Sequence, residues 1–325
     1  MGTLVRELLP PAPDERIIYV NGEFLPQSRA LISVLDHGLM YGDGCFDAWC
    51  GRNGFIFQHE MHTKRLFRSI KALKLDRWLS MGYQEMFDTV IETVRRNVVT
   101  DFYVKVLVTR GISSEPVINM RDCKEASVII YARPTVYEMD MEKMESQGIR
   151  MKVLSTRRVS HEAIDPQSKT LNYLNIVMGK LEAWDSGYQD GIMLDSNGWV
   201  AECPGYNIFG VKDDTLFTPS HELLRGITRA SVMEMGRDAG MHVEEGFYSA
   251  TDLALADEVF LTNTVSGIAP VVEIDGYVIG TGKPGPRTLQ FARTYVDWLE
   301  SGRYGTQCFP EAWKEGAAEE ASVAT

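Results

Sequence analysis

The sequence has no apolar run long enough to cross a lipid bilayer, which takes about 20 consecutive apolar residues. Basic residues are in the minority: 33 Lys and Arg stand against 45 Asp and Glu, for a formal net charge of −12 at pH 7. A surface of this sign does not attract phosphate backbones or anionic headgroups. We therefore expect neither nucleic acid nor a membrane as a partner.

Cysteines are few, and no two of them form a C-x-x-C pair. Their odd number and wide spacing favour neither a zinc site nor a disulfide framework. We expect no metal site and a reduced, cytoplasmic protein. The five positions are Cys45, Cys50, Cys123, Cys203 and Cys308.

The glycine-rich segments lack the spacing of nucleotide-binding loops. Residues 38–44 (GLMYGDG) read G-x-x-x-G-x-G, which is not the dinucleotide motif, and residues 280–285 (GTGKPG) are not a P-loop. The histidines His59 and His62 flank the entry from a strand into a predicted helix. We interpret them as a solvated pair rather than as metal ligands.

The composition is that of a globular protein, 44% hydrophobic and 24% charged over 325 residues, long enough for two domains. Residues 17–26 (IIYVNGEFLP) predict a hairpin around an Asn-Gly turn. Apolar periodicity predicts helices over 62–74 and 83–99, followed by strands over 102–110 and 127–133. Strands, then helices, then strands again indicate an α+β or α/β domain with helices packed on one sheet.

The second half is richer in short strands, with helices predicted over 171–187, 227–240 and 287–300. This pattern is typical of a curled, barrel-like sheet. We interpret the polar segment 134–148 as an interdomain linker and the last residues as a disordered tail. The predicted organisation is a small N-terminal α/β domain (1–133), the linker (134–148), a larger C-terminal domain (149–305) and the tail (306–325).

Four segments of the second half carry residues suited to one chemistry. Lys169 comes just before a helical run, and Glu202 lies in the outgoing strand of a hairpin. Ile227 and Thr228 open a helix, where free N–H groups and the helix dipole favour an anion. Thr264 lies in a polar turn after a strand.

Together with residues 36–48 (DHGLMYGDGCFDA) and 62–75 (HTKRLFRSIKALKL), these segments resemble the fold-type IV enzymes that depend on pyridoxal 5′-phosphate (PLP). That group contains branched-chain and D-amino acid aminotransferases, (R)-selective amine transaminases and aminodeoxychorismate lyase. The resemblance spans about residues 17–303. It implies a small α/β domain, a larger pseudo-barrel domain, a PLP cofactor and a homodimer with active sites at the subunit interface.

The resemblance also implies roles for single residues. Lys169 matches the lysine that holds PLP as a Schiff base, which requires a pKa below the roughly 10.4 of free lysine so that the amine is neutral. The same amine is then a base for proton transfer. Glu202 matches the partner of the pyridine nitrogen, and Tyr173 matches the tyrosine that bonds the ring oxygen. The positions matching the phosphate-binding residues are Arg65, Ile227, Thr228 and Thr264.

The substrate side departs from the branched-chain aminotransferase pattern. Where those enzymes read F-E-G-I-R and Y-I-R, this chain reads F-D-A-W-C (46–50) and Y-V-K (103–105). Cys50 and Lys105 thus replace two arginines, and lysine cannot bind a carboxylate bidentately. Trp49 is expected to add an aromatic ring beside the pocket. The predicted pocket residues are Tyr41, Phe46, Ala48, Trp49, Tyr103, Lys105 and Val265.

These replacements remove charge and add apolar bulk. The first prediction is therefore a transaminase that moves an amino group from an apolar (R)-amine or amino acid to a 2-oxo acid by a ping-pong mechanism. The alternatives are a branched-chain L-amino acid or D-amino acid aminotransferase, and a PLP lyase that needs no acceptor. Tyr41 and the loop 111–125 are expected to contribute to the neighbouring subunit's site.

Overall fold

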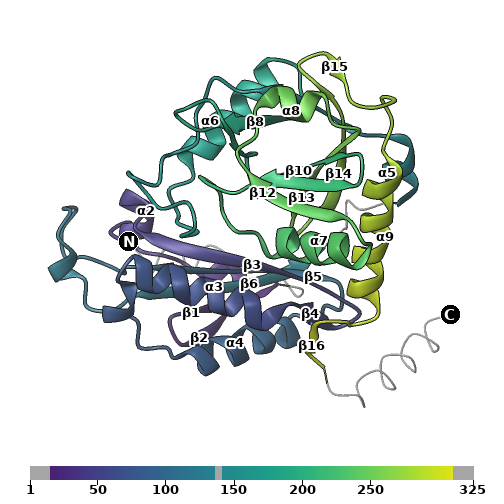
Figure 1. Ribbon diagram of the computed structural model, residues 1–325. Helices are drawn as coiled ribbons and strands as arrows, with labels where there is room; N and C mark the ends of the chain where they lie inside the picture. The colour runs from purple at the N-terminus through teal and green to yellow at the C-terminus, as the bar shows by residue number, and fades with distance from the viewer. Residues whose placement is uncertain (1–14, 136–140, 310–325) are drawn as a thin grey trace.

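The computed structural model describes residues 15–135 and 141–309, which fold around two β-sheets, each with its own helices (Figure 1). This arrangement agrees with the predicted mixed, two-domain fold. Eight α-helices lie in the described residues: α2 (His37–Tyr41), α3 (His59–Ala72), α4 (Tyr83–Arg96), α5 (Met141–Ser146), α6 (Leu174–Asp185), α7 (Ile227–Asp238), α8 (Ala250–Ala254) and α9 (Pro286–Glu300). Short 3₁₀ turns cover Gln27–Arg29, Leu75–Arg77 and Met120–Asp122.

The first sheet is antiparallel throughout the described pairs. Its hairpin turns at Asn21 and Gly22, both with positive φ (49° and 96°), as the Asn-Gly signal predicts. The strand order is β16 (Gly305–Gln307), β4 (Phe55–Phe57), β3 (Gly44–Arg52), β5 (Phe102–Thr109), β6 (Ser127–Pro134), β1 (Ile17–Val20) and β2 (Glu23–Pro26).

The second sheet is mixed, with parallel pairs β11–β12, β14–β7 and β7–β8. It curls in the upper part of Figure 1, with α9 along one side. Its order is β12 (His242–Gly246), β11 (Thr215–Pro219), β10 (Asn207–Lys212), β13 (Glu258–Asn263), β14 (Gly267–Ile274), β7 (Ile149–Val153), β8 (Asp190–Leu194) and β9 (Val200–Glu202), with β15 (Tyr277–Val278) paired to β14.

Helices α3 and α4 cover one face of the first sheet because their apolar residues recur at helical spacing. Leu66 of α3 and Val90 and Val94 of α4 are fully buried against Trp49 and Phe102 of the sheet. Each such side chain contributes roughly 1.5–3 kcal/mol of hydrophobic stabilisation. The opposite face of this sheet is directed toward the second domain.

Alternate side chains of strand β3 face two different environments. Cys45 and Trp49 point to the core under α3 and α4, whereas Phe46 and Ala48 point to a cavity between the sheets. Successive side chains of a strand face opposite sides. Cys50 continues the second series and is buried in the core around α7 and α9.

One expectation about the chain's organisation needs correction. The tail was predicted from residue 306, but Thr306 and Gln307 belong to β16, which pairs with β4 of the first sheet. Cys308 and Phe309 are buried as well. The segment 134–148 contains helix α5, and its role as an interdomain linker stays a prediction. The rest of the predicted tail, 310–325, lies outside the described residues, and the domain limits 1–133 and 149–305 stay predictions.

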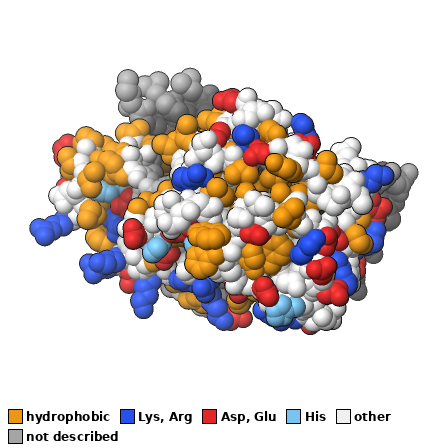
Figure 2. Space-filling view, turned by 45° about the horizontal axis from the view of Figure 1, so that its top comes forward, with side chains coloured by type: hydrophobic (Ala, Val, Ile, Leu, Met, Phe, Trp, Pro, Cys, Tyr) orange, Lys and Arg blue, Asp and Glu red, His pale blue; other side chains and the backbone are white. Residues whose placement is uncertain are grey.

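The surface is mixed in character. On the face shown in Figure 2, acidic and basic side chains are interspersed with groups of hydrophobic ones. None of the helices in the described parts of the chain is long and apolar enough to cross a membrane.

Candidate active site

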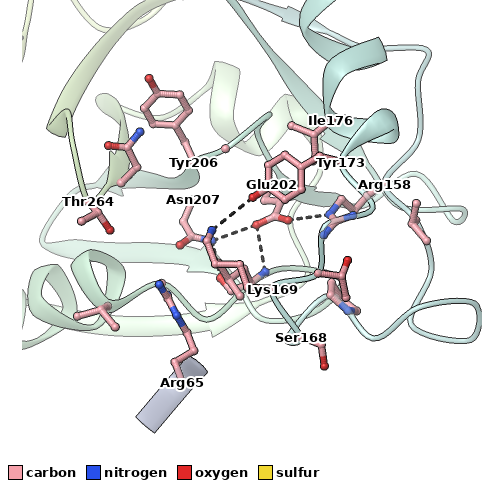
Figure 3. A pocket seen from close by; sticks show the side chains of 18 of the residues that line it. Arg65, Arg158, Ser168, Lys169, Tyr173, Ile176, Glu202, Tyr206, Asn207 and Thr264 are labelled. Carbon is pink, nitrogen blue, oxygen red and sulfur yellow. Dashed lines mark hydrogen bonds and ion pairs between the residues drawn. The ribbon is translucent and has the colours of Figure 1, made fainter. Parts of the chain in front are cut away.

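A cavity with about 810 Å³ of empty space, part of it open to solvent, lies where residues of both domains meet. Arg65 of α3 enters from the first domain, and Lys169, Glu202 and Thr264 come from the second (Figure 3). A second hollow opens beside it and shares Lys169, Tyr173, Gly205, Asn263 and Thr264 with the first.

Lys169 is fixed by its backbone to the first domain. Its N–H donates to Ser69 Oγ of α3 at 3.1 Å, and its carbonyl accepts from the N–H of Phe46 in β3 at 2.9 Å. Its Nζ lies 3.3 Å from the Tyr173 hydroxyl and 4.7 Å from the centre of the Phe46 ring. Burial, with the Arg65 charge, lowers the pKa of Lys169 to about 8. Near physiological pH the neutral fraction of this amine is therefore far larger than that of an exposed lysine, although the protonated form still predominates.

Glu202 lies at the end of β9 and is only 6% exposed. Its Oε1 accepts from Arg158 Nε at 2.7 Å, and its Oε2 accepts from the N–H of Leu224 at 3.1 Å and from Asn207 Nδ2 at 3.5 Å. Burial raises the pKa of Glu202, and Arg158 opposes that rise. The charged form of the Glu202 carboxylate is therefore stabilised by Arg158, which the sequence analysis did not identify.

Tyr173 precedes α6 rather than lying within it, so its ring is free to turn toward Lys169 (Figure 3). Burial raises the pKa of the Tyr173 hydroxyl. It therefore stays protonated at neutral pH and is able to donate a hydrogen bond into the cavity.

Helix α7 begins at the cavity wall without a side-chain cap. Gly226 precedes it, and a Cβ at that position would lie 2.2 Å from Asn207 Oδ1, so only glycine allows this approach. The first-turn N–H groups at Ile227 and Thr228 form a ready anion site. Nearby, Thr262 Oγ1 is buried and has no hydrogen-bond partner among the described residues.

Arg65 points into the cavity from α3 and is held from behind by Asp47, its Nε and Nη2 each lying 2.8 Å from one carboxylate oxygen. The interpretation of His59 and His62 as a solvated pair is wrong. Helix α3 begins at His59, which turns both rings inward, and each residue is 1% exposed. His62 Nδ1 lies 2.8 Å from Asp47 Oδ1, and His59 Nε2 lies 3.0 Å from the carbonyl of Phe87.

Five of the seven predicted pocket residues line the second hollow: Phe46, Ala48, Tyr103, Lys105 and Val265. The Lys105 ammonium lies 4.4 Å from the centre of the Phe46 ring. Burial and the nearby Lys169 charge lower the pKa of Lys105. Lys105 has no carboxylate partner among the described residues.

Two pocket predictions do not match this chain's cavity. Trp49 is wrong as a pocket residue: it is fully buried on the other face of β3, where its Nε1 donates to the carbonyl of His59 at 3.4 Å. Tyr41 lies outside both hollows and packs on His37. Its contribution to a neighbouring subunit stays a prediction. Cys50 also lines neither hollow.

Asn263 is a further residue that sequence reasoning missed. Its side-chain oxygen accepts the N–H groups of Val265 (2.9 Å) and Ser266 (2.6 Å) in the turn that borders both hollows. The Asx-turn propensity of Asn was the available signal. Arg158 offered no such signal, because it follows β7 in a segment without regular structure.

Comparison with known proteins identifies the class. Residues 44–274 match the model of the family "Amino-transferase class IV", so the chain belongs to this family of PLP-dependent aminotransferases. It is 37% identical over 282 residues to a putative branched-chain-amino-acid aminotransferase of Methanocaldococcus jannaschii, covering 86% of this chain and 95% of that one. It is 34% identical over 287 residues to the branched-chain-amino-acid aminotransferase of Escherichia coli, covering 86% and 91%.

Solved structures agree with this assignment. The branched-chain amino acid aminotransferase of T.th., in its crystal structure with pyridoxamine 5′-phosphate, superposes with a TM-score of 0.86 at 30% identity, covering 91% of this chain and 99% of that one. The Escherichia coli enzyme gives 0.85 at 30% identity, covering 91% and 100%. The predicted fold-type IV fold, PLP cofactor and aminotransferase class are thereby confirmed.

The residues around the cavity fit PLP. A lysine with a lowered pKa is suited to bind an aldehyde, and the uncapped start of α7 with Arg65 is suited to bind a phosphate. The buried Glu202 carboxylate faces the same cavity (Figure 3), where it is suited to bind a protonated ring nitrogen. Within the described ranges, no group of three or more His, Cys, Asp or Glu could hold a metal ion.

Proposed function

We propose that this chain moves amino groups from an apolar amino acid of the branched-chain type to a 2-oxo acid, by a ping-pong cycle. The observation that carries the proposal is the second hollow, in which Lys105 and Lys169 lie among the apolar side chains of Phe46, Ala48 and Val265. The apolar wall suits an aliphatic side chain. Lys105 suits the distal carboxylate of a dicarboxylic acceptor. The branched-chain aminotransferase relatives support this alternative over the (R)-amine donor that the sequence favoured first.

In this proposal each cavity residue has one task. PLP, when bound, supplies an electron-poor ring that stabilises negative charge on the amine carbon. Lys169 holds the cofactor and, once released, moves the proton from that carbon. Tyr173 donates to the ring oxygen and Glu202 holds the proton on the ring nitrogen. The proposed phosphate-binding residues are Arg65, Ile227, Thr228 and Thr264.

Lys105 sets the acceptor preference in this scheme. A lysine binds a carboxylate as a point charge, without the bidentate fork of arginine. The pocket therefore holds dicarboxylic acceptors less firmly than an arginine pocket would, and it leaves more room for apolar side chains. An enzyme of this kind accepts an apolar amino acid in one half of the cycle and a dicarboxylic acceptor in the other half.

An apolar (R)-amine donor is the second candidate, favoured by Asn263. Val265 lines the second hollow, and the Asn263 oxygen already accepts from the amides of Val265 and Ser266. A donor with a carboxylate would have to displace that oxygen to use these amides. A donor without a carboxylate would leave the Asn263 oxygen in place.

A donor panel decides between the candidates. L-leucine, D-alanine and (R)- and (S)-1-phenylethylamine are each offered with 2-oxoglutarate and with pyruvate, and amino transfer is followed by chromatography. Turnover of L-leucine with 2-oxoglutarate and none of the amines supports the first candidate, whereas the reverse supports the second. Preferred turnover of D-alanine identifies a D-amino acid enzyme. Product release that is independent of the acceptor identifies a lyase and sinks both candidates.

The lysine assignment is tested separately by borohydride reduction and peptide mapping. The phosphopyridoxyl group is expected on Lys169. A Lys169→Arg variant is the matched control, because it keeps the positive charge but cannot hold the cofactor covalently. An adduct on Lys105 instead would overturn the assignment, since both lysines face the Phe46 ring.

We also propose a homodimer in the cytoplasm. Exposed apolar side chains close to Tyr41 support a partner surface; they include Leu31, Ile32, Val34 and Leu39, which are 42–76% exposed. Light scattering tests the mass, and cell fractionation tests the location. Mixed dimers of Lys169→Ala and Tyr41→Ala chains should regain activity, because one site then has both native residues. No recovery would remove Tyr41 from the partner's site.

A further inference from the structure

Behind the cavity wall, a fully buried carboxylate joins two side chains of α3. Asp47 is 0% exposed and lies on the helix-facing side of β3, between Phe46 and Ala48, which face the cavity. Both of its oxygens contact Arg65, at 2.8 Å to Nε and 2.8 Å to Nη2. A bidentate contact of this kind fixes the plane of the guanidinium group as well as its position.

His62 contacts the same carboxylate, at the oxygen that Arg65 Nη2 also contacts. Its Nδ1 lies 2.8 Å from Asp47 Oδ1, and the N–H of Ala48 adds a fourth contact at 2.7 Å. Burial lowers the pKa of His62, so its ring is neutral and Nδ1–H donates. Although burial works against it, Arg65 and His62 hold the pKa of Asp47 well below its usual range. The carboxylate is therefore charged and has little freedom to move.

The contact with Asp47 determines which part of Arg65 is available to a ligand. Nε and Nη2 are turned back toward β3, so Nη1 is the nitrogen left for the cavity. The Arg65 side chain is 11% exposed, and Figure 3 shows it directed into the cavity. Ordinary surface arginines lose conformational freedom when they bind an anion, and this one is ordered in advance.

We propose that Asp47 is a positioning residue that, together with His62, aims Arg65 at the phosphate group of the cofactor. The inference rests on the phosphate-binding role proposed for Arg65. It goes further in assigning the strand residue on the non-cavity face of β3 to cofactor binding. Asp47 touches neither hollow and acts only through Arg65.

A role of Asp47 in neutralising Arg65 and a role in orienting Arg65 predict opposite effects of Asp47→Asn on anion binding. If Asp47 merely neutralised Arg65, its removal would leave the cavity more positive and would tighten anion binding. If Asp47 positions Arg65, the amide loses one of the two strong contacts and the arginine becomes mobile. Anion binding then weakens although the site gains positive charge.

The experiment measures PLP affinity of the cofactor-free protein by absorbance titration, with inorganic phosphate as a competing probe. We expect Asp47→Asn to weaken PLP binding about tenfold, or roughly 1.4 kcal/mol, and to reduce phosphate competition. Asp47→Glu should restore most of the affinity. The matched control is Asp36→Asn, a carboxylate 2% exposed in the same domain that accepts from Thr109, Ser127 and Gly38 and lines neither hollow.

A purely structural role is excluded by two further readouts. Asp36→Asn should lower the melting temperature without changing PLP affinity. Asp47→Asn should in addition lower the pH at which Lys169 of the cofactor-free protein becomes reactive in competitive acylation, since Asp47 raises the pKa of Lys169 in the native chain. If Asp47→Asn does not fold, His62→Phe removes one donor from the carboxylate and should weaken PLP binding in the same direction.

Unchanged or tighter PLP binding in Asp47→Asn, or in His62→Phe where that variant replaces it, would overturn the inference. Arg65→Gln separates this outcome from failure of the proposed function. If Arg65→Gln weakens PLP binding and Asp47→Asn does not, only the positioning role fails. If neither weakens it, the proposed role of Arg65 fails as well.

Discussion

Replacing Arg158 by methionine should cost about 3 kcal/mol of folding free energy at neutral pH. Arg158 and Glu202 form an ion pair at 2.7 Å whose side chains are only 13% and 8% exposed. Removing one partner of a buried pair leaves an uncompensated charge, which costs about 3–5 kcal/mol. The lower end applies here, because Glu202 keeps the N–H of Leu224 and the weaker contact to Asn207.

The same substitution should change how stability depends on pH. Burial raises the pKa of Glu202 in the folded chain, and without Arg158 that pKa rises further. A carboxyl group whose folded-state pKa is raised destabilises the fold above that pKa, and the penalty falls as the pH falls toward the unfolded value. The deficit of Arg158→Met should therefore be largest near about pH 8 and clearly smaller near about pH 5.

The assay is urea unfolding of the cofactor-free protein, parent and variant, at both pH values. The matched control is Arg293→Met, which breaks an exposed pair with Glu145 (57% and 48% exposed) and should cost at most about 1 kcal/mol. A deficit that is equal at the two pH values, or no larger than that of the control, would refute the electrostatic reasoning. A larger deficit at the lower pH would do the same.

Three further predictions follow from single contacts. In competitive acylation of the cofactor-free protein, Lys169 should become reactive near pH 8, well below the roughly 10.4 of an exposed lysine. Lys105→Ala should raise KM for 2-oxoglutarate about tenfold while leaving KM for an apolar donor nearly unchanged, and Lys105→Arg should not raise it; a parallel loss for both substrates would contradict the anchoring role. Trp49→Ala should cost about 3–5 kcal/mol of stability without altering the order of donors in the panel, and a changed donor order would return Trp49 to the pocket.

The parts of the site that the sequence predicted lie in short segments whose combined resemblance to the fold-type IV enzymes assigned their roles. Lys169 before a helical run, Glu202 in a hairpin strand and the helix start at Ile227 each have a pattern within a few residues. All three line the cavity. The hairpin at Asn21 and Gly22 and the helices over 83–96 and 227–238 were predictable from local patterns of this kind.

The parts that were missed depend on contacts between distant segments. Arg158 reaches Glu202 across 44 residues of chain from a segment without regular structure. Strand β16 is only three residues long and pairs with β4, which lies far earlier in the chain. A segment this short has no periodicity from which a strand could be predicted. The pair His59 and His62 was misjudged because α3 begins earlier than its apolar pattern. A left-handed Gln58 (φ 51°) starts the helix there.

The incorrect placement of Trp49 in the pocket shows that the two faces of β3 have different roles. A one-residue shift along a strand moves a side chain to the opposite face. Phe46 and Ala48 therefore line the second hollow, while Asp47 and Trp49, one residue away along the strand, contact the helix that carries Arg65. Substitutions at even positions of 46–49 should then change which donor is accepted, and those at odd positions should change cofactor affinity or stability. A single strand thus couples the two halves of the site, and the donor panel and the PLP titration measure them independently.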